Sequence, residues 1–166
     1  ILPILPSGGQ SAWKNPYQDV TDSSSYYEAV CYVTEKGLMN GTSASTFSPD
    51  AAMTRAMMVT ILWRMEKEPA ALKSNFTDLT ADWYRTAVDW AAETGVVNGV
   101  GNGKFAPNAT LSLEQLITIL YRYAENKGYN VSKSASLDSF TDGSAVSAYA
   151  KPAMQWAVGM NFLSGN

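Results

Sequence analysis

Histidine is absent from this chain of 166 residues, and cysteine occurs once, at Cys31. Without histidine the chain lacks the commonest general base and metal ligand, which excludes Ser-His-Asp and Cys-His catalysis and the usual zinc sites. We interpret Cys31 as a small, half-buried helix residue, because a reactive thiol would need an activating partner. No paired-carboxylate signature replaces these groups. The sequence therefore predicts neither an enzyme nor a metal or other cofactor.

Charge is also scarce, at 16% of residues against about a quarter in typical domains. A net charge of −3 and a pI near 4.9 argue against nucleic acid as a partner, since phosphate binding needs a basic face. A polar surface built from Ser, Thr, Asn and Tyr suits an extracellular protein. No apolar run approaches the roughly 18 residues of a membrane span. The 46% of apolar residues can bury a core, in one domain or in several small units that share one.

Residues 1–16 have the composition of a tail or linker. Two prolines in Ile1–Pro6 oppose regular helix, and Ser-Gly-Gly-Gln follows them. The stretch has no basic region before its few aliphatic residues, so we do not expect it to be a signal peptide.

What the chain does contain is an internal repeat. The segment Phe47–Arg64 reappears as Phe105–Arg122, at an offset of 58 residues throughout. Each copy passes from Phe-x-Pro to an apolar stripe at helical spacing. Thr54 is the expected N-cap of the first of these helices, and Ser112 with Gln115 forms a capping box before the second.

A shorter helix precedes each of these copies and, in a third copy, stands alone. We expect the three short helices to end at left-handed residues, namely Gly37, Gly95 and Asn161. The predicted units are residues 17–70, 71–128 and 129–166, and the last contains only the first half of a repeat. In it, Ser147 is the expected cap, and Pro152 requires a place in the first turn. The predicted fold class is all-α.

Phe76-x-Asp78, Trp83-Tyr84, Gly95-x-x-x-Gly99, Phe105-x-Pro107 and Thr54-Arg55-Ala56 together resemble the S-layer homology domain. The resemblance spans about residues 17–166. It implies three helical repeats that form a pseudo-threefold, spindle-like bundle, in which the third repeat here lacks its second helix. It further implies a secreted bacterial protein of the cell surface or cell wall. Such domains are non-catalytic and bind secondary cell-wall polysaccharide, often pyruvylated, in grooves between repeats.

The motif is incomplete in this chain. Met57 stands where the family has Glu, and Leu113 replaces the Arg in the second copy. The expected ligand-binding residues are Thr54, Arg55, Trp83, Tyr84, Trp90, Asn98 and Lys104.

Arg55 follows a helix N-cap, where free N–H groups and the helix dipole favour an anion, and its guanidinium suits a carboxylate. The alternative is a surface arginine paired with Asp19 or Asp78. Aromatic residues at helical spacing are commonly core, which applies above all to Tyr84. We interpret the glycines between residues 99 and 103 as a tight turn rather than a phosphate loop.

Asp19, Asp78 and Asp142 recur one repeat apart, and we interpret them as local caps or turn-formers. A second hypothesis for the whole chain is a degenerate scaffold that docks another protein or a second copy. A half-built third repeat would leave an apolar patch uncovered. Its expected members are Tyr149, Met154, Trp156 and Phe162.

Overall fold

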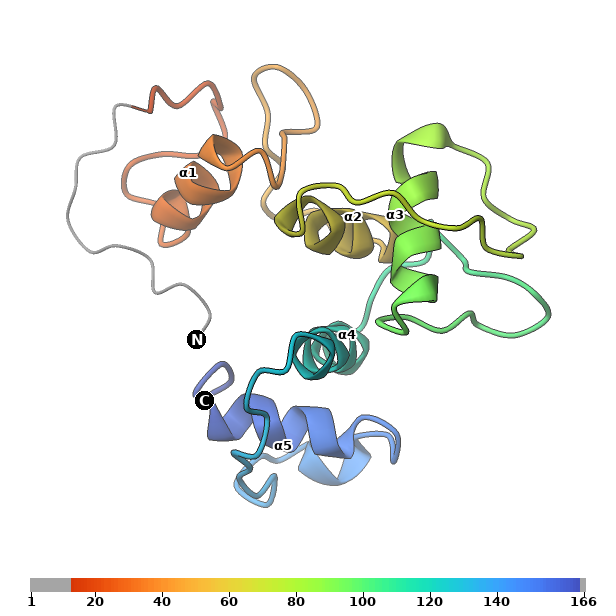
Figure 1. Cartoon of the computed structure of the whole chain (residues 1–166). Helices are drawn as coiled ribbons and strands as arrows, with labels where there is room; N and C mark the ends of the chain where they lie inside the picture. The colour runs from red at the N-terminus through yellow and green to blue at the C-terminus, as the bar shows by residue number, and fades with distance from the viewer. Residues whose placement is uncertain (1–12, 165–166) are drawn as a thin grey trace.

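The computed structural model describes residues 13–164, and these form an all-α fold (Figure 1). No strand occurs among these residues, and two isolated bridges, Thr54 with Thr110 and Gly101 with Lys104, are their only β-type pairings. The helices are α1 (Tyr27–Glu35), α2 (Arg55–Met65), α3 (Asp82–Glu93), α4 (Leu113–Asn126), the short 3-10 helix η1 (Gly143–Ala145) and α5 (Lys151–Gly159). The predicted tail, residues 1–16, lies mostly outside the described part.

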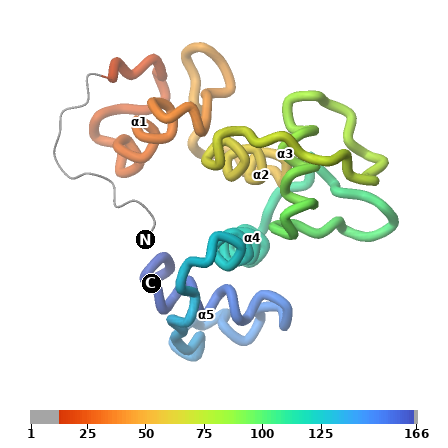
Figure 2. The backbone as a smooth tube through the Cα atoms, in the orientation of Figure 1, coloured from red at the N-terminus to blue at the C-terminus, as the bar shows by residue number. Residues whose placement is uncertain are grey.

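Two helix pairs organise the fold: α2 packs against α3, and α4 packs against α5. The α2–α3 cluster buries Leu62, Tyr84, Val88 and Phe105 almost completely. The α4–α5 cluster is smaller and centres on Ile117, Trp156 and Ala157. Helix α1 stands apart on the left of Figures 1 and 2, where it has a small cluster of its own.

The helix starts follow the predicted capping signals in two cases. The Thr54 hydroxyl accepts from the Met57 N–H, and Ser112 and Gln115 exchange the two hydrogen bonds of a capping box. The prediction for Ser147 was wrong, because α5 begins at Lys151 without a side-chain cap. Ser147 instead donates its hydroxyl and its backbone N–H to Glu114 on α4.

The ends of the three short helices agree with the sequence. Gly37, Gly95 and Asn161 have φ values of 66°, 73° and 58°, the left-handed conformation that glycine and asparagine adopt at least cost. Pro152 lies in the first turn of α5, where its missing N–H leaves no helical hydrogen bond unmade.

Aspartates close the loops that lead into α2 and α4, over a longer range than the sequence suggested. The Asp19 carboxylate accepts from the Phe47 and Ser48 N–H groups at 2.8 and 2.7 Å, and Asp78 accepts from those of Phe105 and Ala106 at 2.9 and 2.8 Å. These bonds span 28, 29, 27 and 28 residues, so the acids are loop clamps rather than local turn-formers.

Candidate functional site

Arg55 lies at the first position of α2, where it joins the first Phe-x-Pro unit to the second. Its Nε donates to the Phe105 carbonyl at 2.8 Å, and its Nη2 donates to the Asn98 carbonyl at 3.0 Å. The guanidinium carbon stands 4.8 Å from the centre of the Phe105 ring, a cation–π contact. The guanidinium is therefore held in one orientation by the loop of the second repeat.

The start of α2 is not an open anion site, contrary to the expectation from its position. The N–H of Arg55 donates to the Ala109 carbonyl and that of Ala56 to the Pro107 carbonyl, at 2.9 and 3.0 Å. The Met57 N–H donates to the Thr54 hydroxyl. Because the protein already satisfies these donors, any affinity for an anion here must come from side-chain charge.

A second cation, Arg122 on α4, lies close enough to act electrostatically on Arg55. Burial lowers the pKa of Arg55, the positive charge of Arg122 lowers it further, and Asp78 and Tyr149 oppose the shift. Arginine nevertheless stays protonated at any physiological pH. Within residues 13–164, no hydrogen bond or ion pair engages the Arg122 guanidinium. An anion placed between the two arginines would relieve their repulsion.

Tyr149 and Glu114 lie beside the two arginines. The Tyr149 hydroxyl donates to Glu114 at 3.2 Å, and its ring is exposed just before α5. Burial, followed by the bond to Glu114, raises the pKa of Tyr149, while both arginines oppose the shift. We call Arg55, Arg122, Glu114 and Tyr149 the arginine surface. No sequence pattern pointed to Arg122, which occupies the same repeat position as Arg64. Tyr149 was predicted as part of an apolar patch instead.

Of the other predicted ligand residues, two lie beside Arg55, two are exposed elsewhere and two are buried. Thr54 and Asn98 adjoin Arg55, the first as the helix cap and the second through its backbone carbonyl. Trp83 is exposed at the start of α3 with its ring against Tyr84, and Lys104 is exposed in the loop whose glycines make a tight turn. Tyr84 and Trp90 lie in the core cluster around α3, so burial removes both from any sugar-binding face.

The predicted apolar patch on the third unit is also smaller than expected. Trp156 is buried against Tyr121 of α4, and Met154 is half-buried. Tyr149 and Phe162 remain exposed. The correction has a clear cause: α4 covers the inner face of α5, so the third unit does not lack a partner there.

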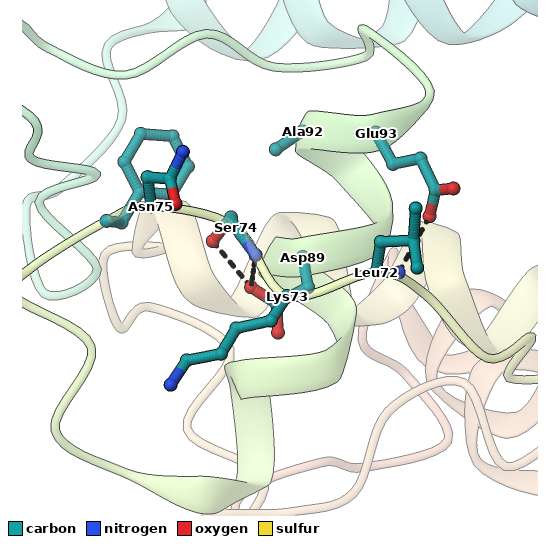
Figure 3. Close-up of a pocket in the computed structure, with 8 residues that line it drawn as sticks. Leu72, Lys73, Ser74, Asn75, Asp89, Ala92 and Glu93 are labelled. Carbon is teal, nitrogen blue, oxygen red and sulfur yellow. Dashed lines mark hydrogen bonds between the residues drawn. The ribbon is translucent and has the colours of Figure 1, made fainter.

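A pocket of about 340 Å³ lies elsewhere, between α3 and residues 72–76 (Figure 3). Some of its polar groups are hydrogen-bonded to each other: Ser74 donates both its N–H and its hydroxyl to Asp89, and the Leu72 N–H donates to Glu93. These bonds hold residues 72–74 against α3.

Comparison with known proteins identifies the family. The S-layer homology domain matches at residues 16–57 and 75–117. An endoglucanase of Bacillus sp. (strain KSM-635) is 32% identical over 155 residues, covering 91% of this chain and 16% of the relative. The surface-layer 125 kDa protein of Lysinibacillus sphaericus is 31% identical over 140 residues, covering 84% and 12%.

The cellulosome-anchoring protein of Acetivibrio thermocellus is 26% identical over 136 residues, covering 76% of this chain and 30% of the relative. The chain thus spans less than a third of the length of each of these three relatives. In the described residues, no helix is long and apolar enough to cross a membrane. The matches fall on both loops clamped by aspartate and on the start of α2, and the chain belongs to the S-layer homology family.

Proposed function

We propose that this chain is a non-catalytic anchoring module that holds a larger exoprotein on the bacterial cell wall by binding secondary cell-wall polysaccharide. Secretion to the cell surface and a pseudo-threefold arrangement of three repeats, the third without its second helix, belong to the same proposal. The names of the relatives support it, since a surface-layer protein and a cellulosome-anchoring protein match most of the chain. The likeness to an endoglucanase covers 16% of that protein, a share too small to carry its activity across.

The observation that carries the proposal is the paired charge of the arginine surface. Arg55 is fixed by two carbonyls, and Arg122 has no partner of its own in residues 13–164. Two guanidinium groups close enough to act electrostatically on each other favour an anion such as a carboxylate, which accepts charge-assisted hydrogen bonds from arginine. A pyruvylated sugar supplies such a group, and the exposed Tyr149 ring offers a flat face beside it.

Sedimentation with purified cell-wall sacculi tests this function. Arg122→Ala should lower the affinity by about tenfold or more, because it removes one charge-assisted contact without breaking a described hydrogen bond. Arg55→Ala should do the same, but it also releases the loop of the second repeat. Lys133→Ala, an exposed cation outside the arginine surface, is the matched control.

Sacculi stripped of their polysaccharide should bind neither the wild type nor the control. Wild-type protein that remains in the supernatant with intact sacculi would exclude the anchoring function. If Arg122→Ala binds intact sacculi as well as the wild type does, the arginine surface takes no part in anchoring.

A degenerate scaffold that docks another protein remains the second candidate. It is favoured by Leu113, which is 56% exposed at the position where the first repeat has Arg55, and by the exposed rings of Tyr149 and Phe162. This function requires self-association or a protein partner. Light scattering that finds a monodisperse monomer, together with no binding of an apolar dye, would argue against it.

A further inference from the structure

The pocket of about 340 Å³ beside α3 belongs neither to the arginine surface nor to the loops that the aspartates clamp. It lies between the second half of α3 and residues 72–76, which run alongside the helix (Figure 3). Its volume is at the low end of the range of small-molecule sites, about 300–1,000 Å³. The pocket therefore has room for a small ligand.

Two carboxylates of α3 line this pocket. Asp89 and Glu93 are four residues apart, a spacing that puts them on one face of the helix. Asp89 is only 7% exposed, and its Oδ1 accepts the N–H and the hydroxyl of Ser74 at 2.9 and 2.5 Å. Glu93 is exposed, and its Oε2 accepts the Leu72 N–H at 3.0 Å. Both acids thus hold the neighbouring segment and line the cavity.

Each carboxylate has a second oxygen that accepts no hydrogen bond from residues 13–164, namely Oδ2 of Asp89 and Oε1 of Glu93. For Asp89 this is costly, because a buried charge needs hydrogen bonds or an opposite charge to offset its lost hydration. Since Asp89 lines the pocket, a donor inside the cavity is well placed to offset that cost.

The charge around the pocket favours a cation. Lys73 also lines it, but no ion pair among residues 13–164 includes Lys73, and Figure 3 shows its side chain extending away from Glu93. Glu93 is the last residue of α3, and the last turn of this helix contains no basic residue to compensate the negative end of its dipole. Two carboxylates and a helix C-terminus therefore face one lysine.

The same place in the third unit is built differently. The helices α3 and α5 end alike, since the turn after each donates an N–H back to an alanine of the last helical turn. This match sets Gln155 against Asp89 and Gly159 against Glu93. A Cβ built on Gly159 would lie 2.9 Å from the Ser134 backbone nitrogen, so the preceding segment rests directly on α5. The pair of carboxylates is thus not a general feature of the repeat.

We propose that the pocket binds the primary ammonium group of a short alkylamine, at a site separate from the arginine surface. An ammonium has three N–H donors, which suffice for the free oxygens of Asp89 and Glu93 and for one water. The alkyl chain lies against Leu72, Ala92 and the ring of Phe76, which line the same pocket. A metal ion fits less well, because no three His, Cys, Asp or Glu side chains of the described residues gather in one place.

Titration with n-pentylammonium, followed by the amide chemical shifts in NMR spectra, tests the site. The Leu72 and Ser74 amides report on it directly, since each donates to one of the two carboxylates. We expect saturable shifts of both amides. The alcohol 1-pentanol, which has the same chain without the charge, should bind about fivefold more weakly or worse. No saturable shift with n-pentylammonium, or equal affinity for the alcohol, would overturn the proposal.

Glu93→Gln removes one charge and retains an acceptor for the Leu72 N–H. It should weaken n-pentylammonium binding by about fivefold, because charge-assisted hydrogen bonds are stronger than neutral ones. Glu28→Gln, which changes an exposed carboxylate of α1 outside the pocket, is the matched control and should bind as the wild type does. Equal affinities of the two variants would overturn the proposal.

Lys73→Gln distinguishes a cation site from a site for an anion or a neutral sugar. Removal of the like charge beside the pocket should raise the affinity for n-pentylammonium slightly, by up to about threefold. A lower affinity in this variant would overturn the choice of a cation. Sacculi take no part in these titrations, so their outcome is independent of the anchoring function.

Discussion

At the scale of single residues, the two loop-clamping aspartates show most directly how the chain holds its loops. Each carboxylate accepts two backbone N–H bonds from a residue pair about 28 positions away. In both loops the second residue of the pair, Ser48 or Ala106, has a positive φ, which is costly for a residue with a side chain. The carboxylate offsets that cost by satisfying N–H groups that would otherwise lose hydrogen bonds.

Asp78→Asn should destabilise the protein by about 1–2 kcal/mol, because a neutral amide accepts more weakly than a carboxylate and presents only one acceptor oxygen. Urea unfolding followed by circular dichroism measures the change. Asp142→Asn is the control, since this exposed aspartate clamps no described loop. Equal losses in the two variants would contradict the clamp.

The same contact sets a pH dependence. Burial alone would raise the pKa of Asp78, but the hydrogen bonds from Phe105 and Ala106 outweigh it and lower the pKa below its usual value. A lowered folded pKa means that the stabilisation is complete above the unfolded pKa, about 3.9, and is lost as the pH falls below it. Wild type and Asp78→Asn should therefore converge in stability in acid and differ most near neutral pH.

Residue identities alone could not reveal the partners of Arg55. The Thr-Arg-Ala motif predicted a helix start with a cation at its first position, and the structure has one. The carbonyls that hold the guanidinium belong to Asn98 and Phe105, 43 and 50 residues away, and no local pattern encodes such a distance. Arg122, which has no hydrogen-bond partner among residues 13–164, was missed for the same reason.

At the scale of elements, periodicity and capping signals predicted where the helices lie, but they predicted poorly which residues of other helices each one contacts. The apolar stripes located α2, α3 and α4, because amphipathic spacing reflects which face is buried. Ser147 was misassigned because serine before a helix is ambiguous. In the structure the Ser147 hydroxyl donates to the Glu114 carboxylate on α4 instead of capping α5. Trp156 was expected at the surface because the sequence does not state that α4 lies across α5.

The turns that follow α1 and α3 bring other atoms close to one glycine each, Gly41 and Gly99. A Cβ built on Gly99 would lie 2.6 Å from the Lys104 carbonyl oxygen and 2.7 Å from the Phe76 ring. Gly99→Ala should therefore cost about 1–3 kcal/mol of folding stability, the range of an overpacked site.

Gly103→Asn is the matched control for this turn. A Cβ on Gly103 meets nothing within 4 Å, and asparagine tolerates its φ of 67°. Thermal unfolding of both variants checks the prediction. A Gly103→Asn variant as unstable as Gly99→Ala would show that turn conformation, rather than contact with Phe76, limits this position.

At the scale of the whole molecule, the sequence predicted equivalent repeats, but the repeats are not equally supported. The short helix of the second repeat lies in the large cluster of α2 and α3, whereas α1 relies on Tyr17, Val20 and Val30 with a few half-buried neighbours. Similar sequences show that each repeat has a similar apolar helix face. Only the arrangement of the helices shows which of these faces has another helix packed against it.

This asymmetry predicts that α1, with its small cluster, opens independently of the rest, whereas α2 of the same repeat stays with the main core. Val30 and Val88 are equivalent, both buried, and each loses the same atoms on substitution by alanine. Val88→Ala should lower the global free energy of unfolding by about 1–3 kcal/mol, since it leaves a cavity in the main core. Val30→Ala should instead accelerate hydrogen exchange within α1 and leave the slowest amides of α3 and α4 unchanged, because a weakly coupled unit opens without global unfolding. Equal acceleration of those slow amides by both variants would mean that all the repeats unfold as one cooperative body.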